Sequence, residues 1–258
     1  MLGERLISNR TQQLLQQTLS NWQSWQTGSL KAPLSQPQIV KELVGGRTNK
    51  TYLVAAGDFS AVVRINAENS VQLGIDRQRE AQILDLLQPT GLTPRVYFIS
   101  DDVLVSEFIE GPTLSAGSMQ ESHAMHGLTN ALLTIQGIQM PGSRRNYLKY
   151  CRDYIAQLSG ETVSNTVVEQ IEQAAIDVDN ADWEPVICHH DMVPENIIQN
   201  ERGLFIIDWE YAALGHPGLD FLRLYGADYA ISQPEQDSLK SLLKVKQAMD
   251  KLWLAVQL

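Results

Sequence analysis

A polar loop between two short apolar runs constrains the fold of this chain more than any other feature. The loop, residues 189–196, contains Asp191 and Asn196, and Asp208 ends the apolar run 204–207 that follows it. A β-hairpin between the loop and Asp208 would bring these three side chains together, and their oxygen atoms are the ligands that Mg²⁺ prefers. Taken singly, each residue is more often a turn or capping residue, so the prediction rests on the combination.

The spacing in this loop follows the pattern H-x-D-x-x-x-x-N of kinase catalytic loops, with His189, Asp191 and Asn196 at the fixed positions. Phosphoryl transfer needs a carboxylate beside the acceptor hydroxyl and oxygen ligands for the Mg²⁺ ions that bridge the nucleotide phosphates. We therefore expect Asp191 to accept or orient the hydroxyl proton. We expect Asn196 and Asp208 to hold Mg²⁺.

Two stretches resemble one enzyme superfamily, that of choline kinases, thiamine kinases and aminoglycoside phosphotransferases. They are Cys188-His189-His190-Asp191 and Ile207-Asp208-Trp209-Glu210-Tyr211-Ala212. The second resembles the choline and thiamine kinase branch in particular, at the place where protein kinases have D-F-G. The resemblance extends over roughly residues 39–229. It implies an α+β, two-lobed protein-kinase-like fold and transfer of the γ-phosphate of ATP to the hydroxyl of a small molecule.

The pattern of apolar residues is compatible with that fold. We expect an N-terminal nucleotide-binding lobe, residues 1–108, with an antiparallel sheet, one internal helix and an extra N-terminal helix. The expected strands are 38–44, 51–55, 59–65, 95–99 and 103–108, and the expected helices are 4–26 and 71–87. A mostly helical C-terminal lobe, residues 109–258, would carry the catalytic loop, the metal site and the acceptor site. Its expected helices are 119–138, 145–159, 163–178, 218–230 and 233–258, and its expected strands are 185–188 and 204–207.

The resemblance also implies which residues bind the nucleotide phosphates. The segment Gly45-Gly46-Arg47-Thr48-Asn49 resembles the G-G-x-[ST]-N loop of the superfamily. Two glycines alone usually mark only a turn. With the other motifs present, we expect the backbone at Gly46 and the side chains of Thr48 and Asn49 to contact the phosphates.

Four further residues complete the expected ATP site. Arg64 stands where protein kinases carry a lysine, and its guanidinium can bind phosphate oxygens and pair with Glu80. Residues 104–111 resemble the hinge between the lobes, which implies that the Glu107 carbonyl and the Ile109 N–H bind adenine, although this segment could equally be an ordinary edge strand. Asp220 resembles a buried aspartate that braces the catalytic loop in this superfamily, and we assign His190 no role.

The acceptor site is expected to favour a cation. Residues 188–230 contain seven acidic side chains against two arginines, together with four aromatic side chains of the Trp and Tyr types. Cations are attracted to aromatic faces and nearby carboxylates, so Asp228 and Tyr229 are expected acceptor-binding residues. Tyr211 joins them because it resembles a position beside the substrate in this superfamily. The prediction is a cationic alcohol such as thiamine or choline. Trp253 is the last tryptophan of the chain, so a complete aromatic cage is not expected.

An aminoglycoside or sugar kinase is the alternative, and a nucleotide-binding pseudoenzyme is the alternative of another class.

Composition excludes some partners. The formal net charge is −10, and no basic face is concentrated in the sequence, so we expect no nucleic-acid partner. No apolar run approaches the roughly 20 residues that span a bilayer, so we expect no membrane partner. The two cysteines lack metal-ligand spacing, which favours a reducing compartment and a cytoplasmic location. The oligomeric state stays open.

Overall fold

The computed structural model describes residues 9–28, 32–44, 48–115, 122–158, 164–232 and 236–256. The chain forms two compact units. The first comprises Met1–Ser70 and Thr93–Glu110, and the second comprises Val71–Leu92 and Gly111–Leu258. Residues 71–92 thus belong to the second unit, although they precede the last two strands of the first.

An antiparallel five-stranded sheet forms the first unit, as the sequence predicts. Its order is β1-β2-β3-β5-β4. The strands are β1 (Gln38–Leu43), β2 (Lys50–Ala56), β3 (Phe59–Ile65), β4 (Val96–Ile99) and β5 (Val103–Glu107). A two-residue turn joins β2 to β3, and its Gly57 has φ of +60°, a conformation that glycine adopts without steric cost.

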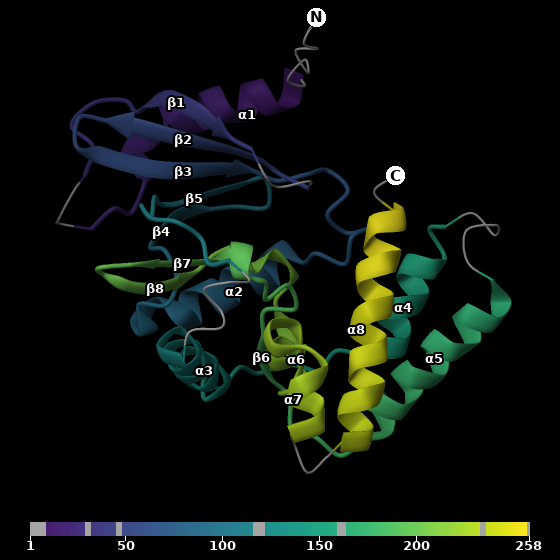
Figure 1. Ribbon diagram of the computed structural model, residues 1–258. Helices are drawn as coiled ribbons and strands as arrows, with labels where there is room; N and C mark the ends of the chain where they lie inside the picture. The colour runs from purple at the N-terminus through teal and green to yellow at the C-terminus, as the bar shows by residue number, and fades with distance from the viewer. Residues whose placement is uncertain are drawn as a thin grey trace, which may run out of the picture. The chain divides into compact units, whose positions relative to one another are not determined.

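One face of this sheet is covered by the helix α1 (Asn9–Ser20), which Figure 1 shows in purple along the strands. Its apolar residues Leu15 and Leu19 pack in one buried cluster with alternate residues of the strands, among them Val54 and Val63. Residues that alternate along a strand share one face, so this spacing buries one side of the sheet under the helix. The expected helix at 4–26 is therefore confirmed over its central part.

The helix α2 (Arg77–Leu87) begins six residues later than the sequence predicts. The predicted start at Val71 is wrong for two reasons. Gly74 has φ of +70°, which a right-handed helix does not allow. The side chain of Asp76 accepts a hydrogen bond from the Arg79 N–H at 3.0 Å and so caps the helix there.

Two short antiparallel strand pairs lie in the second unit. The strand β6 (Val186–Cys188) pairs with β9 (Ala213–Gly215), and β7 (Ile197–Asn200) pairs with β8 (Gly203–Ile206). The strand β6 ends directly before the polar loop, and β7 begins directly after it. The hairpin predicted between Asn196 and Asp208 is therefore present.

The remainder of the second unit is helical. The helices are α3 (Ser122–Gln136), α4 (Tyr147–Ile155), α5 (Asn165–Asn180), α6 (Leu219–Tyr225), α7 (Ala227–Ser232) and α8 (Gln236–Val256). Figure 1 shows α8 in yellow beside α4 and α5, and buried residues of these helices share one apolar cluster. The predicted helix at 218–230 is divided into α6 and α7, because Gly226 has φ of +66°. Within the described parts of the chain, every helix is too short or too polar to cross a bilayer.

Candidate active site

The loop that carries Asp191 is held from below by a buried carboxylate. Asp220, near the start of α6, is 1% exposed, and it accepts hydrogen bonds from the N–H groups of His189 and His190 at 2.7 and 3.1 Å. His190 has φ of +65°, an uncommon value for a residue other than glycine. Asp220 therefore holds the backbone in this conformation directly before Asp191, as the resemblance implied.

Asp191 and Asn196 contact each other within the loop. The Asn196 amide nitrogen donates to the Asp191 carbonyl oxygen at 2.9 Å and to its Oδ2 at 3.2 Å. The Asp191 side chain is 37% exposed, so a small molecule in solution can reach its carboxylate. This arrangement fixes the carboxylate from one side and leaves it accessible from another, as a general base requires.

Arg223, which the sequence analysis missed, is a further neighbour of Asp191. Its Nη2 lies 3.5 Å from Asp191 Oδ1, and its Nη1 lies 2.9 Å from Asp250 Oδ1. Its Nε donates to the His190 carbonyl. Arg223 follows Asp220 by one helical turn on α6, and this spacing was the available signal. Asp250 comes from α8, and no sequence pattern pointed to it.

The hairpin of β7 and β8 brings Asp208 back toward the loop. Strand pairing ends at Ile197 and Ile206, and the Ile207 N–H donates to the Asn196 carbonyl at 2.9 Å. Asp208 itself adopts the left-handed conformation, with φ of +65° and ψ of +59°. Left-handed residues other than glycine are uncommon and gather at functional sites. The geometry thus places Asp208 one residue after the backbone contact with Asn196.

The donor atoms of these residues fit a magnesium ion. Because the Asn196 amide nitrogen is engaged with Asp191, the amide oxygen is the atom able to bind a cation. Asp208 supplies a carboxylate. Among the described residues, no group of three or more His, Cys, Asp or Glu side chains could hold a metal. Mg²⁺ is usually bound by one or two protein carboxylates together with phosphate oxygens and water, so this small donor set suits it.

Three of the expected nucleotide-binding residues are described in the first unit near the sheet, and Gly46 lies outside the described residues. Asn49 accepts a hydrogen bond from the Ala67 N–H at 3.1 Å, and Thr48 directly precedes it. Arg64, on β3, is 7% exposed, and its Nε donates to the side chain of Asn66 at 2.9 Å. The phosphate contacts assigned to these residues stay predictions.

The other expected nucleotide-binding residues lie at the end of β5 and on α2. Glu107 ends β5, and Ile109 is buried. Glu80 is 1% exposed in the second unit, where Arg77 Nη1 lies 2.8 Å from its carboxylate and 3.0 Å from that of Glu210. This buried ion-paired group was not foreseen. The pair of Arg64 with Glu80 would join the two units and stays a prediction.

The expected acceptor-binding residues lie in different surroundings. Tyr211 is 8% exposed, and its hydroxyl accepts a hydrogen bond from the indole N–H of Trp253 at 2.8 Å. Tyr229 stacks on Phe221, with ring centroids 5.1 Å apart and planes at 11°. Asp228 is exposed on α7. Trp253 packs against the clusters of both tyrosines, so it is an aromatic neighbour that sequence reasoning undervalued.

Burial governs the titration of the remaining polar groups near the loop. It lowers the pKa of His190 well below the usual range for histidine and lowers that of His216 to about 4. It also raises the pKa of the Cys188 thiol well above the usual value. Both imidazoles are therefore neutral at pH 7, and Cys188 is an uncharged packing residue rather than a nucleophile.

These features define a class of proteins, the protein-kinase-like phosphotransferases. They are the antiparallel sheet of the first unit, the mostly helical second unit, and the loop of Asp191 and Asn196, which Asp220 braces and Asp208 follows. Solved structures share this fold. For the choline kinase LicA from Streptococcus pneumoniae the TM-score is 0.71 at 19% identity, over 96% of this chain and 91% of that one. For APH(2")-IIa, solved in a ternary complex with streptomycin and ATP, the TM-score is 0.61 at 17% identity, over 93% and 87% of the two chains.

Within that class, this chain belongs to the choline/ethanolamine kinase family, whose profile matches residues 40–240. It is 26% identical to ethanolamine kinase 2 of Mus musculus over 196 residues, which cover 70% of this chain and 51% of the relative. The chain thus spans about half the length of this curated relative. The expected superfamily and fold class are confirmed.

Proposed function

We propose that this protein transfers the γ-phosphate of ATP to the hydroxyl of a small amino alcohol, choline or ethanolamine. The observation that carries the proposal is the Asp191–Asn196 pair, hydrogen-bonded at 3.2 Å between Nδ2 and Oδ2, in a chain of the choline/ethanolamine kinase family. Two similar proteins support both acceptors: one is a choline kinase and the other an ethanolamine kinase.

Asp191 is the proposed catalytic base. The acceptor hydroxyl gives its proton to the Asp191 carboxylate, its oxygen bonds to the γ-phosphorus, and ADP leaves with the electrons of the broken bond. Asn196 holds Oδ2, and Arg223 faces Oδ1 at 3.5 Å, so the carboxylate is oriented at both oxygens. A positioned base of this kind typically contributes about 10²- to 10⁴-fold to the rate.

Asn196 and Asp208 are the proposed magnesium-binding residues. They offer one amide oxygen and one carboxylate, a set that leaves most of the coordination shell to phosphate oxygens and water. When bound, magnesium neutralises charge on the nucleotide phosphates. Within the chain itself, the hydrogen bonds from Asp220 and the hairpin of β7 and β8 fix the backbone positions of Asn196 and Asp208.

Nucleotide binding is proposed for the residues that the resemblance selected. The backbone at Gly46 and the side chains of Thr48 and Asn49 would contact the phosphates. Arg64 would bind phosphate oxygens and pair with Glu80. The Glu107 carbonyl and the Ile109 N–H would bind adenine. The ATP complex of APH(2")-IIa, which has the same fold, supports this use of the fold.

The acceptor is proposed to be cationic. Tyr211 and Trp253 form a hydrogen-bonded aromatic pair, and aromatic faces attract ammonium groups by about 0.5 to 2 kcal/mol. Asp228 and Tyr229 are the further proposed contacts. Family membership favours choline or ethanolamine over thiamine among the cationic alcohols that the sequence suggested.

An acceptor screen tests this proposal. ADP release would be measured with choline, ethanolamine, thiamine, glucosamine and kanamycin, each with Mg²⁺ and ATP, and the Asp191→Asn variant would serve as the control for contaminating activity. The proposal expects the highest kcat/KM for choline or ethanolamine and loss of that activity in the variant. Faster turnover of glucosamine or of kanamycin would contradict the acceptor, and ATP binding without any turnover would indicate a pseudoenzyme.

A further inference from the structure

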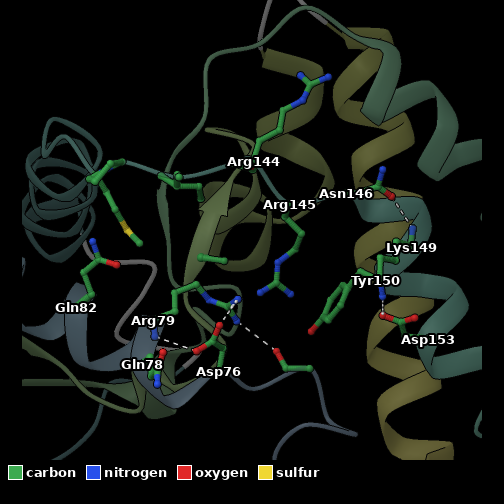
Figure 2. A pocket seen from close by; sticks show the side chains of 17 residues that line it. Asp76, Gln78, Arg79, Gln82, Arg144, Arg145, Asn146, Lys149, Tyr150 and Asp153 are labelled. Atoms are coloured by element: carbon green, nitrogen blue, oxygen red, sulfur yellow. Dashed lines mark hydrogen bonds and ion pairs between the residues drawn. The ribbon is translucent and has the colours of Figure 1, made fainter.

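A polar pocket lies in the second unit, apart from the residues proposed for phosphoryl transfer. Its volume is about 540 Å³, and it is formed by the start of α2, residues 140–146, α4 and β9 (Figure 2). Asp191, Asn196 and Asp208 do not line it. Ligand pockets in proteins commonly measure about 300 to 1,000 Å³, so this one has room for a small molecule.

The charge of this pocket is opposite to that of the chain. Its lining contains four basic residues, Arg79, Arg144, Arg145 and Lys149, and two acidic ones, Asp76 and Asp153, a balance of 4 − 2 = +2. The chain as a whole has a formal net charge of −10. Both acids are already paired: Lys149 lies 2.6 Å from Asp153, and Arg79 lies 3.6 Å from Asp76. An excess of positive charge thus gathers in one cavity of an acidic protein.

Arg145 has unused hydrogen-bonding capacity in this pocket. Its Nη2 donates to the Tyr211 carbonyl at 3.1 Å, and its guanidinium carbon lies 4.2 Å from the centre of the Tyr150 ring. Its Nη1 is buried and has no hydrogen-bond partner among the described residues. A buried charged donor without an acceptor is costly, and each such group calls for an explanation. A bound anion would supply the acceptor.

Arg79 lies close enough to Arg145 for their charges to interact. Its Nε donates to the Ala212 carbonyl at 2.7 Å, and that residue directly follows the one bound by Arg145. Figure 2 shows both guanidinium groups extending into the same space from different segments. Burial, with the nearby positive charge of Arg145, lowers the pKa of Arg79 below its usual value. Asp76, 3.6 Å from Arg79, offsets part of the repulsion between these two like charges, and an anion bound between them would offset more of it.

We propose that this pocket binds a small molecule that carries a phosphate group, through Arg145 Nη1 and the guanidinium of Arg79. Guanidinium groups match the geometry of phosphate oxygens, and two of them neutralise a dianion. The free phosphate ion and a phosphomonoester share this chemistry. The cavity is larger than a phosphate ion alone requires, which favours the monoester.

Calorimetric titration of the purified protein tests this site without any measurement of kinase activity. Inorganic phosphate and glycerol 3-phosphate are the two probes, and saturating adenosine, which carries no phosphate group, is present to occupy the adenine site. Loss of one charge-assisted hydrogen bond weakens binding by about 10- to 100-fold, and we expect Arg145→Gln to show this loss. Circular dichroism confirms that the variant is folded.

Two further variants make the result specific. Gln82 is an exposed residue of the pocket lining, and Gln82→Glu adds a negative charge there without removing a contact that the fold needs. We expect this variant to stay folded and to bind the probes about 10-fold more weakly. Arg144→Gln is the matched control, because the Arg144 guanidinium lies 4.5 Å from the Trp183 ring and donates to backbone carbonyls; its effect should stay within about 3-fold.

The outcomes separate the sources of phosphate. Tighter binding of glycerol 3-phosphate, lost in both Arg145→Gln and Gln82→Glu, supports a phosphomonoester site, and the same pattern for inorganic phosphate alone supports an ion site. Equal affinity of the wild type and these two variants for both probes, or no binding at millimolar concentrations, would overturn the proposal. None of these results depends on whether the protein phosphorylates an amino alcohol.

Discussion

Replacement of Asp220 by alanine is the perturbation whose size follows most directly from the structure. Asp220 is 1% exposed and accepts two backbone N–H groups at 2.7 and 3.1 Å. Without it, both donors would be buried without an acceptor, at about 1.5 to 3 kcal/mol for each hydrogen bond to a charged group. Burial of the carboxylate, which raises the pKa of Asp220, offsets part of this gain. We expect Asp220→Ala to lower the unfolding free energy by about 2 to 4 kcal/mol.

Urea denaturation followed by circular dichroism would measure this loss, and the kcat of the folded fraction would be measured alongside it. Because the two N–H groups immediately precede Asp191, we expect kcat to fall about 10-fold or more in addition. Asp228→Ala is the control for stability, since Asp228 is an exposed carboxylate on α7 and its removal should change the unfolding free energy by less than about 0.5 kcal/mol. A loss below about 1 kcal/mol in Asp220→Ala with unchanged kcat would refute the bracing role.

Three other predictions concern the metal, the acceptor and pH. Asp208→Ala should abolish Mg²⁺-dependent nucleotide binding in calorimetry and Asn196→Ala should weaken it less; wild-type affinity for Mg-ATP in Asp208→Ala would place the metal elsewhere. Tyr211→Ala should raise the KM for the acceptor about 2- to 30-fold and leave the KM for ATP nearly unchanged, while Tyr211→Phe, which keeps the ring, should be mild. Because burial lowers the pKa of His216 from 6.5 to about 4, the unfolded state binds more protons between these values, and the unfolding free energy should fall by about 3 kcal/mol as the pH falls through this window. Denaturation at several pH values would show a shallower slope in His216→Gln, and parallel slopes for the two proteins would contradict the assignment.

The sequence predicts strands more closely than helix ends. The strand at 59–65 is observed with the same bounds, because a glycine turn precedes it and buried residues alternate along it. The predicted helix at 71–87 is too long, and the predicted helix at 218–230 is two helices. Apolar spacing continues through Gly74 and Gly226, but their positive φ values interrupt a right-handed helix. Local pattern thus predicts which elements exist, and backbone conformation at single glycines decides where they end.

The active site is predictable where its residues share one short segment. Asp191 and Asn196 lie in one motif, and their hydrogen bond follows from its spacing. Arg223 and Trp253 reach the site from α6 and α8, where tertiary packing decides what they contact, and no short motif encodes that packing. The buried group of Arg77 with Glu80 and Glu210 was missed for the same reason.

The most direct test of the central claim is a measurement of phosphoryl transfer by the wild type and by Asp191→Asn. With Mg-ATP and choline or ethanolamine, ³¹P NMR would follow formation of the phosphomonoester, and circular dichroism would confirm that both proteins are folded. We expect the wild type to form the product and Asp191→Asn to form it about 10²- to 10⁴-fold more slowly at unchanged ATP affinity. Near-normal turnover in the folded variant would contradict the role of Asp191, and no product from the wild type with either acceptor would contradict the proposed function.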